Sequence, residues 1–135
     1  MPIRLEIVTP ESKIFSDDVE EVVLPGVEGE FGVLPGHESF VTQIFPGELV
    51  VTQNGKLLYL AIGEGFVEVQ PDRVSVLTDM AMRADDINEL EVEAARKRAE
   101  DALAQKLTDE ESAAVQAALQ KSLAQLHVKR RRRSG

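Results

Sequence analysis

Glycine and proline are distributed very unevenly along this chain. It has nine glycines and six prolines, and all of them except Gly135 lie before residue 84. Both residue types interrupt regular structure, because glycine permits positive φ angles while proline fixes φ and lacks a backbone donor. The sequence therefore predicts short elements joined by frequent turns up to residue 84, and long uninterrupted helices after it.

Before residue 84 the apolar residues recur with a period of two, which is typical of half-buried strands. Ile3, Leu5 and Ile7 alternate with Arg4 and Glu6. Further runs lie at residues 19–24, 49–52, 57–62, 66–69 and 74–78, and the first of them is closed by Pro25-Gly26. Asn54-Gly55 separates two of the runs and is the strongest short hairpin signal, while Pro71-Asp72 marks another turn. Such spacing predicts a sandwich or flattened barrel of mostly antiparallel strands.

After residue 84 alanine dominates and the period becomes helical. Asp86 with Glu89 and Thr108 with Glu111 are expected to cap the starts of two helices. The first helix is expected to present Ile87, Leu90, Ala94, Ala95, Ala99, Ala102 and Leu103 on one face, and the second Val115, Leu119, Ser122, Leu123 and Leu126.

The fold class expected from these patterns is α+β, mainly β. An antiparallel β-sandwich over residues 1–84 is followed by an antiparallel α-helical hairpin over residues 85–135. Alanine-lined faces bury little area, and each Å² of apolar surface contributes only about 25 cal/mol. We therefore expect the hairpin to be the less stable half and able to separate from the sandwich.

The segment 25–40 is the richest in turn signals, with four glycines and two prolines around the short apolar stretch 31–34. It predicts two turns that flank one short strand. A phosphate-binding loop is a poor interpretation, because no Lys-Ser/Thr follows the last glycine and no helix is expected to begin there. A catalytic role for His37 is equally weak, since the other histidine, His127, lies far along the sequence and no third group positions either one.

Neither a metal site nor an enzyme active site is indicated. The chain has two histidines and no cysteine, so only scattered carboxylates remain as ligands. The cluster Asp17-Asp18-Glu20-Glu21 lacks the glycine and terminal glutamate of a calcium loop, and a solvated strand end is the preferred interpretation. We expect a protein without catalytic, cofactor-binding or metal-ligating residues.

Charge is also unevenly placed. The net charge is −9, yet residues 85–135 carry equal numbers of acidic and basic side chains. Five of the basic ones form the terminal run Lys129, Arg130, Arg131, Arg132 and Arg133. The acidic body disfavours general nucleic-acid binding. The residues of the basic run are compatible with four roles: binding nucleic acid, binding anionic lipid, pairing with an acidic protein surface, or simple solvation.

No apolar run is long enough to span a bilayer and no signal peptide is visible, so we expect a soluble, intracellular protein.

Several segments together give the chain a family resemblance. They are Val8-Thr9-Pro10, the block Gly29-Glu30-Phe31-Gly32-Val33-Leu34-Pro35-Gly36-His37, Gly65-Phe66-Val67-Glu68-Val69-Gln70-Pro71-Asp72, Val76-Leu77-Thr78-Asp79, and Glu93-Ala94-Ala95-Arg96-Lys97-Arg98-Ala99-Glu100. With these segments in this order, the chain resembles the epsilon subunit of bacterial F-type ATP synthases over essentially its whole length.

The resemblance implies a non-catalytic subunit of the central stalk, peripheral to the cytoplasmic face of the bacterial cell membrane and not inserted in it. It implies a sandwich that binds the gamma subunit and the c-ring, and that couples proton flow to ATP synthesis. It also implies a hairpin that can extend into the alpha/beta catalytic head and block ATP hydrolysis. The alternative is a stand-alone sandwich that binds proteins and dimerises through its hairpin.

The resemblance assigns roles to individual residues. Glu30 falls where the family's sandwich meets the c-ring, and Gly36, His37 and Thr42 lie in the stretch that faces gamma. Some relatives bind ATP through an Ile/Leu-Asp-x-x-Arg-Ala motif, but here Asn88 replaces the aspartate and Glu91 replaces the arginine. We therefore expect weak or absent ATP binding, because a carboxylate repels phosphate. In an extended hairpin the run 129–133 is expected to pair with acidic loops of the catalytic head.

Overall fold

The computed structural model describes the backbone of residues 2–133 and the side chains of residues 2–132. Ten strands in this range form the first part of the chain. They are β1 (Ile3–Val8), β2 (Lys13–Val19), β3 (Glu21–Gly26), β4 (Gly29–Val33), β5 (Phe40–Ile44), β6 (Gly47–Gln53), β7 (Lys56–Ile62), β8 (Gly65–Gln70), β9 (Arg73–Thr78) and β10 (Ala81–Arg83). A short 3₁₀ turn, η1 (Ala84–Asp86), leads to α1 (Glu89–Leu103) and α2 (Asp109–Arg133).

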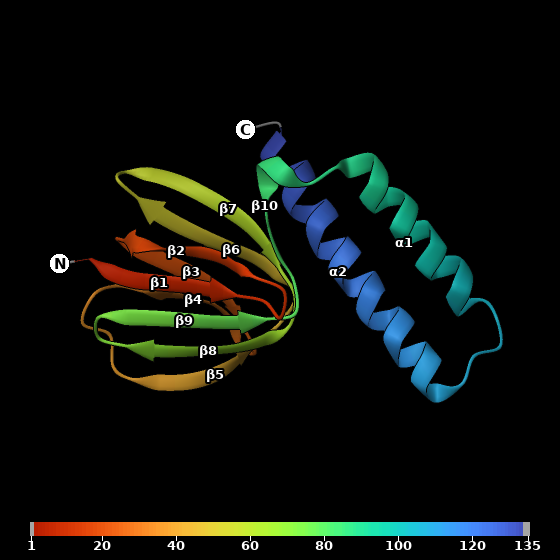
Figure 1. Ribbon diagram of the computed structural model, residues 1–135, viewed down its shortest axis with the longest axis horizontal. Helices are drawn as coiled ribbons and strands as arrows, with labels where there is room; N and C mark the ends of the chain where they lie inside the picture. The colour runs from red at the N-terminus through yellow and green to blue at the C-terminus, as the bar shows by residue number, and fades with distance from the viewer. Residues whose placement is uncertain (1, 134–135) are drawn as a thin grey trace.

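The strands form one continuous sheet that folds over on itself. Its order is β10-β7-β6-β3-β5-β8-β9-β1-β2, with β4 paired to β3 outside this path. All pairings are antiparallel except that of β1 with β9. The alternating residues of β1 pack in the same buried cluster as those of β6 and β7, at the far end of the strand order. This shared core closes the sheet into a sandwich (Figure 1), and the expected α+β, mainly β fold is confirmed.

Most of the predicted strands and turns are present, and the differences are local. Asn54 and Gly55 have φ angles of 53° and 76° and join β6 to β7, as the hairpin signal predicts. Pro25-Gly26 does not close a strand but belongs to β3, where the Pro25 carbonyl oxygen accepts from the Phe45 amide at 3.0 Å. The acidic residues Asp17 and Asp18 lie near the end of β2, and both are exposed, which agrees with the solvated strand end that the sequence predicts.

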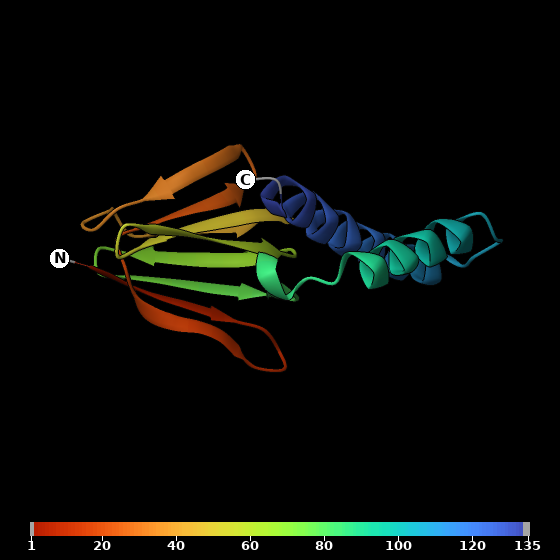
Figure 2. The ribbon, with the colours of Figure 1, turned by 90° about the horizontal axis from the view of Figure 1, so that it is seen from above.

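The two helices pack as an antiparallel hairpin that projects from one end of the sandwich (Figures 1 and 2). The capping box at the start of α2 is confirmed: the Glu111 amide donates to Thr108 Oγ1 and the Thr108 amide to Glu111 Oε1, both at 3.1 Å. The prediction for α1 was wrong by two residues. Asn88 is its N-cap, while Asp86 lies in η1.

The inner face of α1 also differs from the prediction. Leu90 is 84% exposed and Ala94 is exposed, so neither packs against α2 as predicted. Ala99 is buried as expected, and Ala95, Ala102 and Leu103 are half-buried. On α2, Ser122 and Leu126 are buried and Leu123 is 41% exposed. The inner faces are thus lined mainly by small residues.

Candidate interaction surfaces

The glycine-rich segment 25–40 forms the two predicted turns around the short strand β4. Gly29 and Gly36 have φ angles of 111° and 87°, which a residue with a side chain rarely adopts. The Gly36 amide donates to the Pro71 carbonyl oxygen at 2.8 Å, and the His37 amide to the Leu34 carbonyl oxygen at 3.2 Å. Backbone hydrogen bonds therefore fix the second turn against the turn between β8 and β9.

Three of the four expected interface residues line one open cavity of about 580 Å³, which we call the β4–β5 cavity. Glu30 lies on β4, His37 in the loop and Thr42 on β5, and Phe31 and Phe40 lie between them. Gly36 is not among the lining residues but directly precedes His37. His37 Nδ1 lies 2.9 Å from the Glu38 carbonyl oxygen, and its ring centroid lies 5.2 Å from that of Phe40.

Large apolar side chains are exposed on the outer side of β5, β8 and β9. Val41, Phe66 and Leu77 are 66%, 57% and 58% exposed, and we call them the exposed sheet face. Phe66 and Leu77 are directly paired across β8 and β9, and Val41 pairs with Glu68 two residues further along β8. Val41 also lines the β4–β5 cavity. Exposed apolar groups that gather in this way are typical of protein-interaction surfaces.

A second surface is already covered, by the end of α2. Ala61 on β7, Ala84 in η1, Ile87 and Val128 on α2 form a small buried cluster separate from the sandwich core. Ile87 was expected on the inner face of the hairpin, but it lies in this junction instead. Tyr59, Met80, Met82 and Val92 are partly buried around these four residues, so the junction has its own small apolar cluster.

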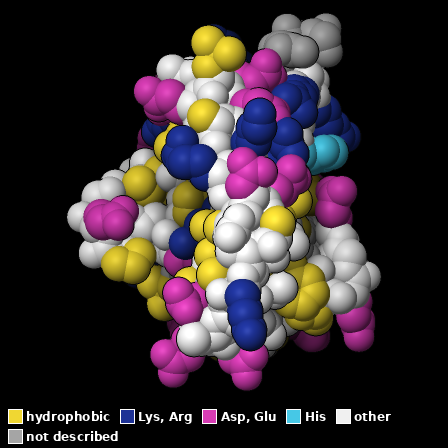
Figure 3. All heavy atoms as spheres, turned by 90° about the vertical axis from the view of Figure 1, so that its right-hand side faces the viewer, with side chains coloured by type: hydrophobic (Ala, Val, Ile, Leu, Met, Phe, Trp, Pro, Cys, Tyr) yellow, Lys and Arg dark blue, Asp and Glu magenta, His cyan; other side chains and the backbone are white. Residues whose placement is uncertain are grey.

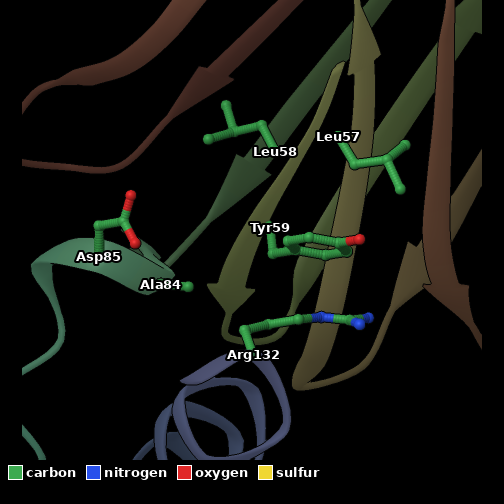
Figure 4. Close-up of a pocket in the computed structure, with 6 residues that line it drawn as sticks. All are labelled: Leu57, Leu58, Tyr59, Ala84, Asp85 and Arg132. Atoms are coloured by element: carbon green, nitrogen blue, oxygen red, sulfur yellow. The ribbon is translucent and has the colours of Figure 1, made fainter. Parts of the chain in front are cut away.

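Polar contacts surround this cluster, and Arg132 makes the closest of them. Its Nη2 donates to Glu48 Oε1 at 2.6 Å and its Nε to Glu48 Oε2 at 2.9 Å. Its guanidinium carbon lies 3.7 Å from the centroid of the Tyr59 ring, and Figure 4 shows the two groups stacked between β7 and α2. The hydrogen bonds to Glu48 raise the pKa of Arg132, although partial burial acts in the opposite direction.

The other basic residues near the end of α2 have partners as well. Lys129 Nζ donates to the Ala84 carbonyl oxygen at 3.2 Å, and Lys121 Nζ lies 3.1 Å from Asp79 Oδ2. Arg130 Nη2 lies 2.6 Å from Glu93 on α1. Figure 3 shows the basic side chains gathered among acidic ones on this face. The side chain of Arg133 lies outside the described residues.

Asn88 and Glu91, which stand where the ATP motif has an aspartate and an arginine, form the N-terminal cap of α1. Asn88 Oδ1 accepts from the Glu91 amide at 3.1 Å, and the Glu91 side chain is exposed. The nearby Arg96 and Arg130 both pair with Glu93, and the hydrogen bond from Arg96 is the main reason that the pKa of Glu93 is lowered. Arg96 and Arg130 are therefore already paired with a carboxylate of the chain itself.

Two kinds of site are absent from the part of the chain that the structure describes. Nowhere among the residues that the structure describes do three potential metal-ligating side chains gather closely enough to hold an ion. Within residues 2–133, neither helix combines the length and the apolar composition needed to cross a membrane.

Sequence reasoning missed the contact of Arg132 with Glu48 and Tyr59. The residues are far apart in the chain, and nothing in the period of β6 or β7 singles out Glu48. The available signal was the charge distribution, because a basic run at the end of an acidic chain favours carboxylate partners.

An exposed apolar sheet face beside a docked helical hairpin is the arrangement of a protein-binding subunit. A family model described as the β-sandwich domain of the ATP synthase delta/epsilon chain matches residues 2–84. A second, described as the long α-helix domain of the same chain, matches residues 85–130. The chain therefore belongs to the ATP synthase delta/epsilon chain family.

Relatives and solved structures agree with this assignment. The ATP synthase epsilon chain of Herpetosiphon aurantiacus is 44% identical over 134 residues, which cover 99% of this chain and 98% of the relative. The ATP synthase epsilon chain of Syntrophobacter fumaroxidans is 46% identical over 126 residues, or 93% of this chain and 94% of the relative. The chain is accordingly a non-catalytic epsilon-type subunit of ATP synthase, and the stand-alone binding module is not favoured.

A solved structure of the Euglena gracilis mitochondrial ATP synthase, comprising OSCP, F1 and c-ring, contains a similar chain. The TM-score is 0.74 at 28% identity, with 91% of this chain and 78% of that chain covered. A chain of the central stalk and c-ring of the Tetrahymena thermophila mitochondrial ATP synthase has a TM-score of 0.62 at 13% identity, with 97% of this chain and 96% of that chain covered. At that identity the second likeness shows the fold alone.

Proposed function

We propose that residues 1–84 dock this subunit onto the gamma subunit and the c-ring, and that residues 85–135 restrain ATP hydrolysis when they leave the sandwich. The observation that carries the docking proposal is the exposed sheet face. Val41, Phe66 and Leu77 leave a large apolar area in water, and burying it against a partner is favourable. Val41 makes this face continuous with the β4–β5 cavity, where Glu30, His37 and Thr42 lie.

The hairpin has the properties of an element with two positions. Its apolar contact with the sandwich is one small cluster, separate from the sandwich core, with four buried residues (Ala61, Ala84, Ile87 and Val128) and partly buried side chains around them. Such a contact stabilises one arrangement by a modest amount, as an element that changes position requires. When extended, the hairpin would meet the alpha/beta head, and its basic run would then be free to pair with acidic loops there.

The proposed location follows from these contacts. A subunit held by gamma and the c-ring lies at the cytoplasmic face of the bacterial membrane, as a peripheral part of the rotor that couples proton movement to ATP synthesis. Direct membrane insertion and nucleic-acid binding have no place in this proposal.

Reversing the charge of Glu30 tests the docking. Glu30 is exposed on β4 and lines the β4–β5 cavity, so Glu30→Lys should place a cation where a carboxylate meets the rotor. We expect reduced coupling, measured as proton pumping per ATP hydrolysed in membranes that contain the whole complex. Glu11→Lys is the matched control, because Glu11 is an exposed carboxylate outside the cavity. Equal coupling in the two variants would refute the placement of Glu30.

A further inference from the structure

We propose that Arg132 fastens the helical hairpin to the sandwich by holding its guanidinium between Glu48 and Tyr59. We call these three residues the arginine clamp. The clamp joins residues of this one chain, so it does not depend on any partner subunit. Its consequence for ATP hydrolysis rests on the proposed function above.

The geometry of the pair is that of a strong ionic contact. Both Glu48 oxygens accept from Arg132, at 2.6 and 2.9 Å, so the two planar groups meet through parallel hydrogen bonds. The Glu48 side chain is only 10% exposed and that of Arg132 is 24% exposed. A bidentate, charge-assisted pair that is largely shielded from water is stronger than an ordinary surface ion pair.

The register between β6 and β7 places Glu48 and Tyr59 next to each other on the sandwich. Glu48 pairs with Ala61, and Val50 pairs with Tyr59, across β6 and β7. Because successive residues of a strand point to opposite faces, Glu48 and Tyr59 lie on the same outer face, away from the core residues Leu49 and Leu60. The face of the Tyr59 ring lies against the guanidinium, and stacking of this kind favours arginine over lysine (Figure 4).

The remaining ion pairs between hairpin and sandwich are weaker. Arg131 reaches Glu48 at 3.4 Å with a side chain that is 53% exposed. Lys121 and Asp79 are each about one third exposed, so water and salt screen their attraction. The buried cluster adds apolar burial that does not depend on charge. Among the ionic contacts, the clamp should therefore supply the largest share of the docking free energy.

The clamp gives the basic run a role opposite to the one expected from the sequence. While Arg132 is held by Glu48, it favours the docked hairpin, and an acidic surface elsewhere must compete with Glu48 to recruit it. Loss of the clamp should therefore increase the extended, inhibitory population of the hairpin.

The test measures the docked population directly in the full chain. The native chain has no cysteine, so two introduced cysteines carry the only labels. Fluorophores at Asp72→Cys in the exposed β8–β9 turn and Lys106→Cys in the exposed hairpin turn report docking by single-molecule energy transfer. Wild type, Glu48→Gln, Arg132→Gln and the double variant are compared. Arg131→Gln is the matched control, because it removes the same charge from the neighbouring residue.

Glu48→Gln and Arg132→Gln should each lower the ratio of docked to undocked molecules by about tenfold, since each removes a shielded ionic hydrogen bond. Arg131→Gln should lower it by less than about twofold. The double variant should lose little more than either single variant, because both remove the same contact.

The clamp would be overturned if Glu48→Gln and Arg132→Gln lowered the ratio of docked to undocked molecules no more than Arg131→Gln does. It would also be overturned if the effects of the two single variants simply added in the double variant. Circular dichroism of each variant separates undocking from unfolding of the sandwich, and the double-variant comparison remains informative if one variant is destabilised. ATP hydrolysis by the assembled complex is measured separately. If the clamp is present in the free chain but Glu48→Gln does not change ATP hydrolysis, the proposed function is contradicted and the clamp stands.

Discussion

Gly65 stands at a position in the sheet where no side chain fits. It begins β8 and pairs with Thr78 of β9 and Ile44 of β5. A Cβ atom at this position would overlap the Leu77 carbonyl oxygen and lie 2.8 Å from the Thr78 Cα atom. Both neighbours are backbone atoms, so relief requires the strand pairing itself to shift.

Gly65→Ala should therefore destabilise the sandwich by about 1–3 kcal/mol, as overpacking does in other cores. Gly32→Ala is the control, because its Cβ atom would meet side-chain atoms alone, the flexible end of Glu21 at 3.3 Å and Val23 at 4.0 Å. The free energy of unfolding in urea, measured for both variants, checks the prediction. A loss at position 65 that is no larger than at position 32 would contradict the role of the close backbone approach.

Asn88 and Glu91 lead to a prediction about ligand binding. Calorimetric titration of the chain with ATP should show no saturable site at micromolar ligand, because Glu91 repels phosphate and the nearby arginines already pair with Glu93. Changing both residues, Asn88→Asp with Glu91→Arg, should raise the affinity. Asn88→Asp alone keeps an N-cap and serves as the control. Micromolar binding by the unmodified chain would show this prediction to be wrong.

At the scale of elements, the start of α2 depends on its capping box. Hydrogen bonds from the Thr108 amide and hydroxyl lower the pKa of Glu111. A carboxyl group with a lowered folded-state pKa stabilises the fold above its unfolded pKa of about 4.3, and this contribution disappears as the pH falls through the folded value. The helical hairpin should thus lose stability in acid.

Glu111→Gln should remove this part of the acid response, and Thr108→Ala should cost about 1 kcal/mol at neutral pH. Thermal melting of the helical circular dichroism signal, followed from neutral pH to about pH 3, measures both effects. Glu110→Gln is the control, because Glu110 is exposed beside Glu111 outside the box. Identical acid profiles for Glu111→Gln and wild type would exclude the capping contribution.

The same scale shows what could be predicted from sequence. The Asn54-Gly55 turn and the Thr108 capping box depend on neighbouring residues, and both are present in the structure. The start of α1 was misplaced because Asp86 and Asn88 are both acceptable caps. Its inner face was partly wrong because which stripe of a short, alanine-rich helix meets α2 is set by tertiary packing, which leaves Leu90 84% exposed.

At the scale of the whole molecule, prediction fails where distant segments meet. The sandwich core follows from period-two patterns, but the site where α2 docks depends on β6 and β7 presenting Glu48 and Tyr59 side by side. Ile87 joined that junction because η1 turns the chain back against the sheet before α1 begins. Such placements are set by tertiary contacts, which no local pattern records.

The central claim is that the sandwich docks the subunit in the rotor and the hairpin restrains hydrolysis. ATP hydrolysis by the complete ATP synthase, assembled with the full chain or with residues 1–84 alone, tests it most directly. The buried residues of the sandwich core lie within residues 3–76, so we expect the shortened chain to keep its fold. Hydrolysis should rise by about fivefold without residues 85–135, a typical size for regulatory coupling, while the shortened subunit stays bound. Unchanged hydrolysis in a complex that retains the shortened subunit would contradict the claim.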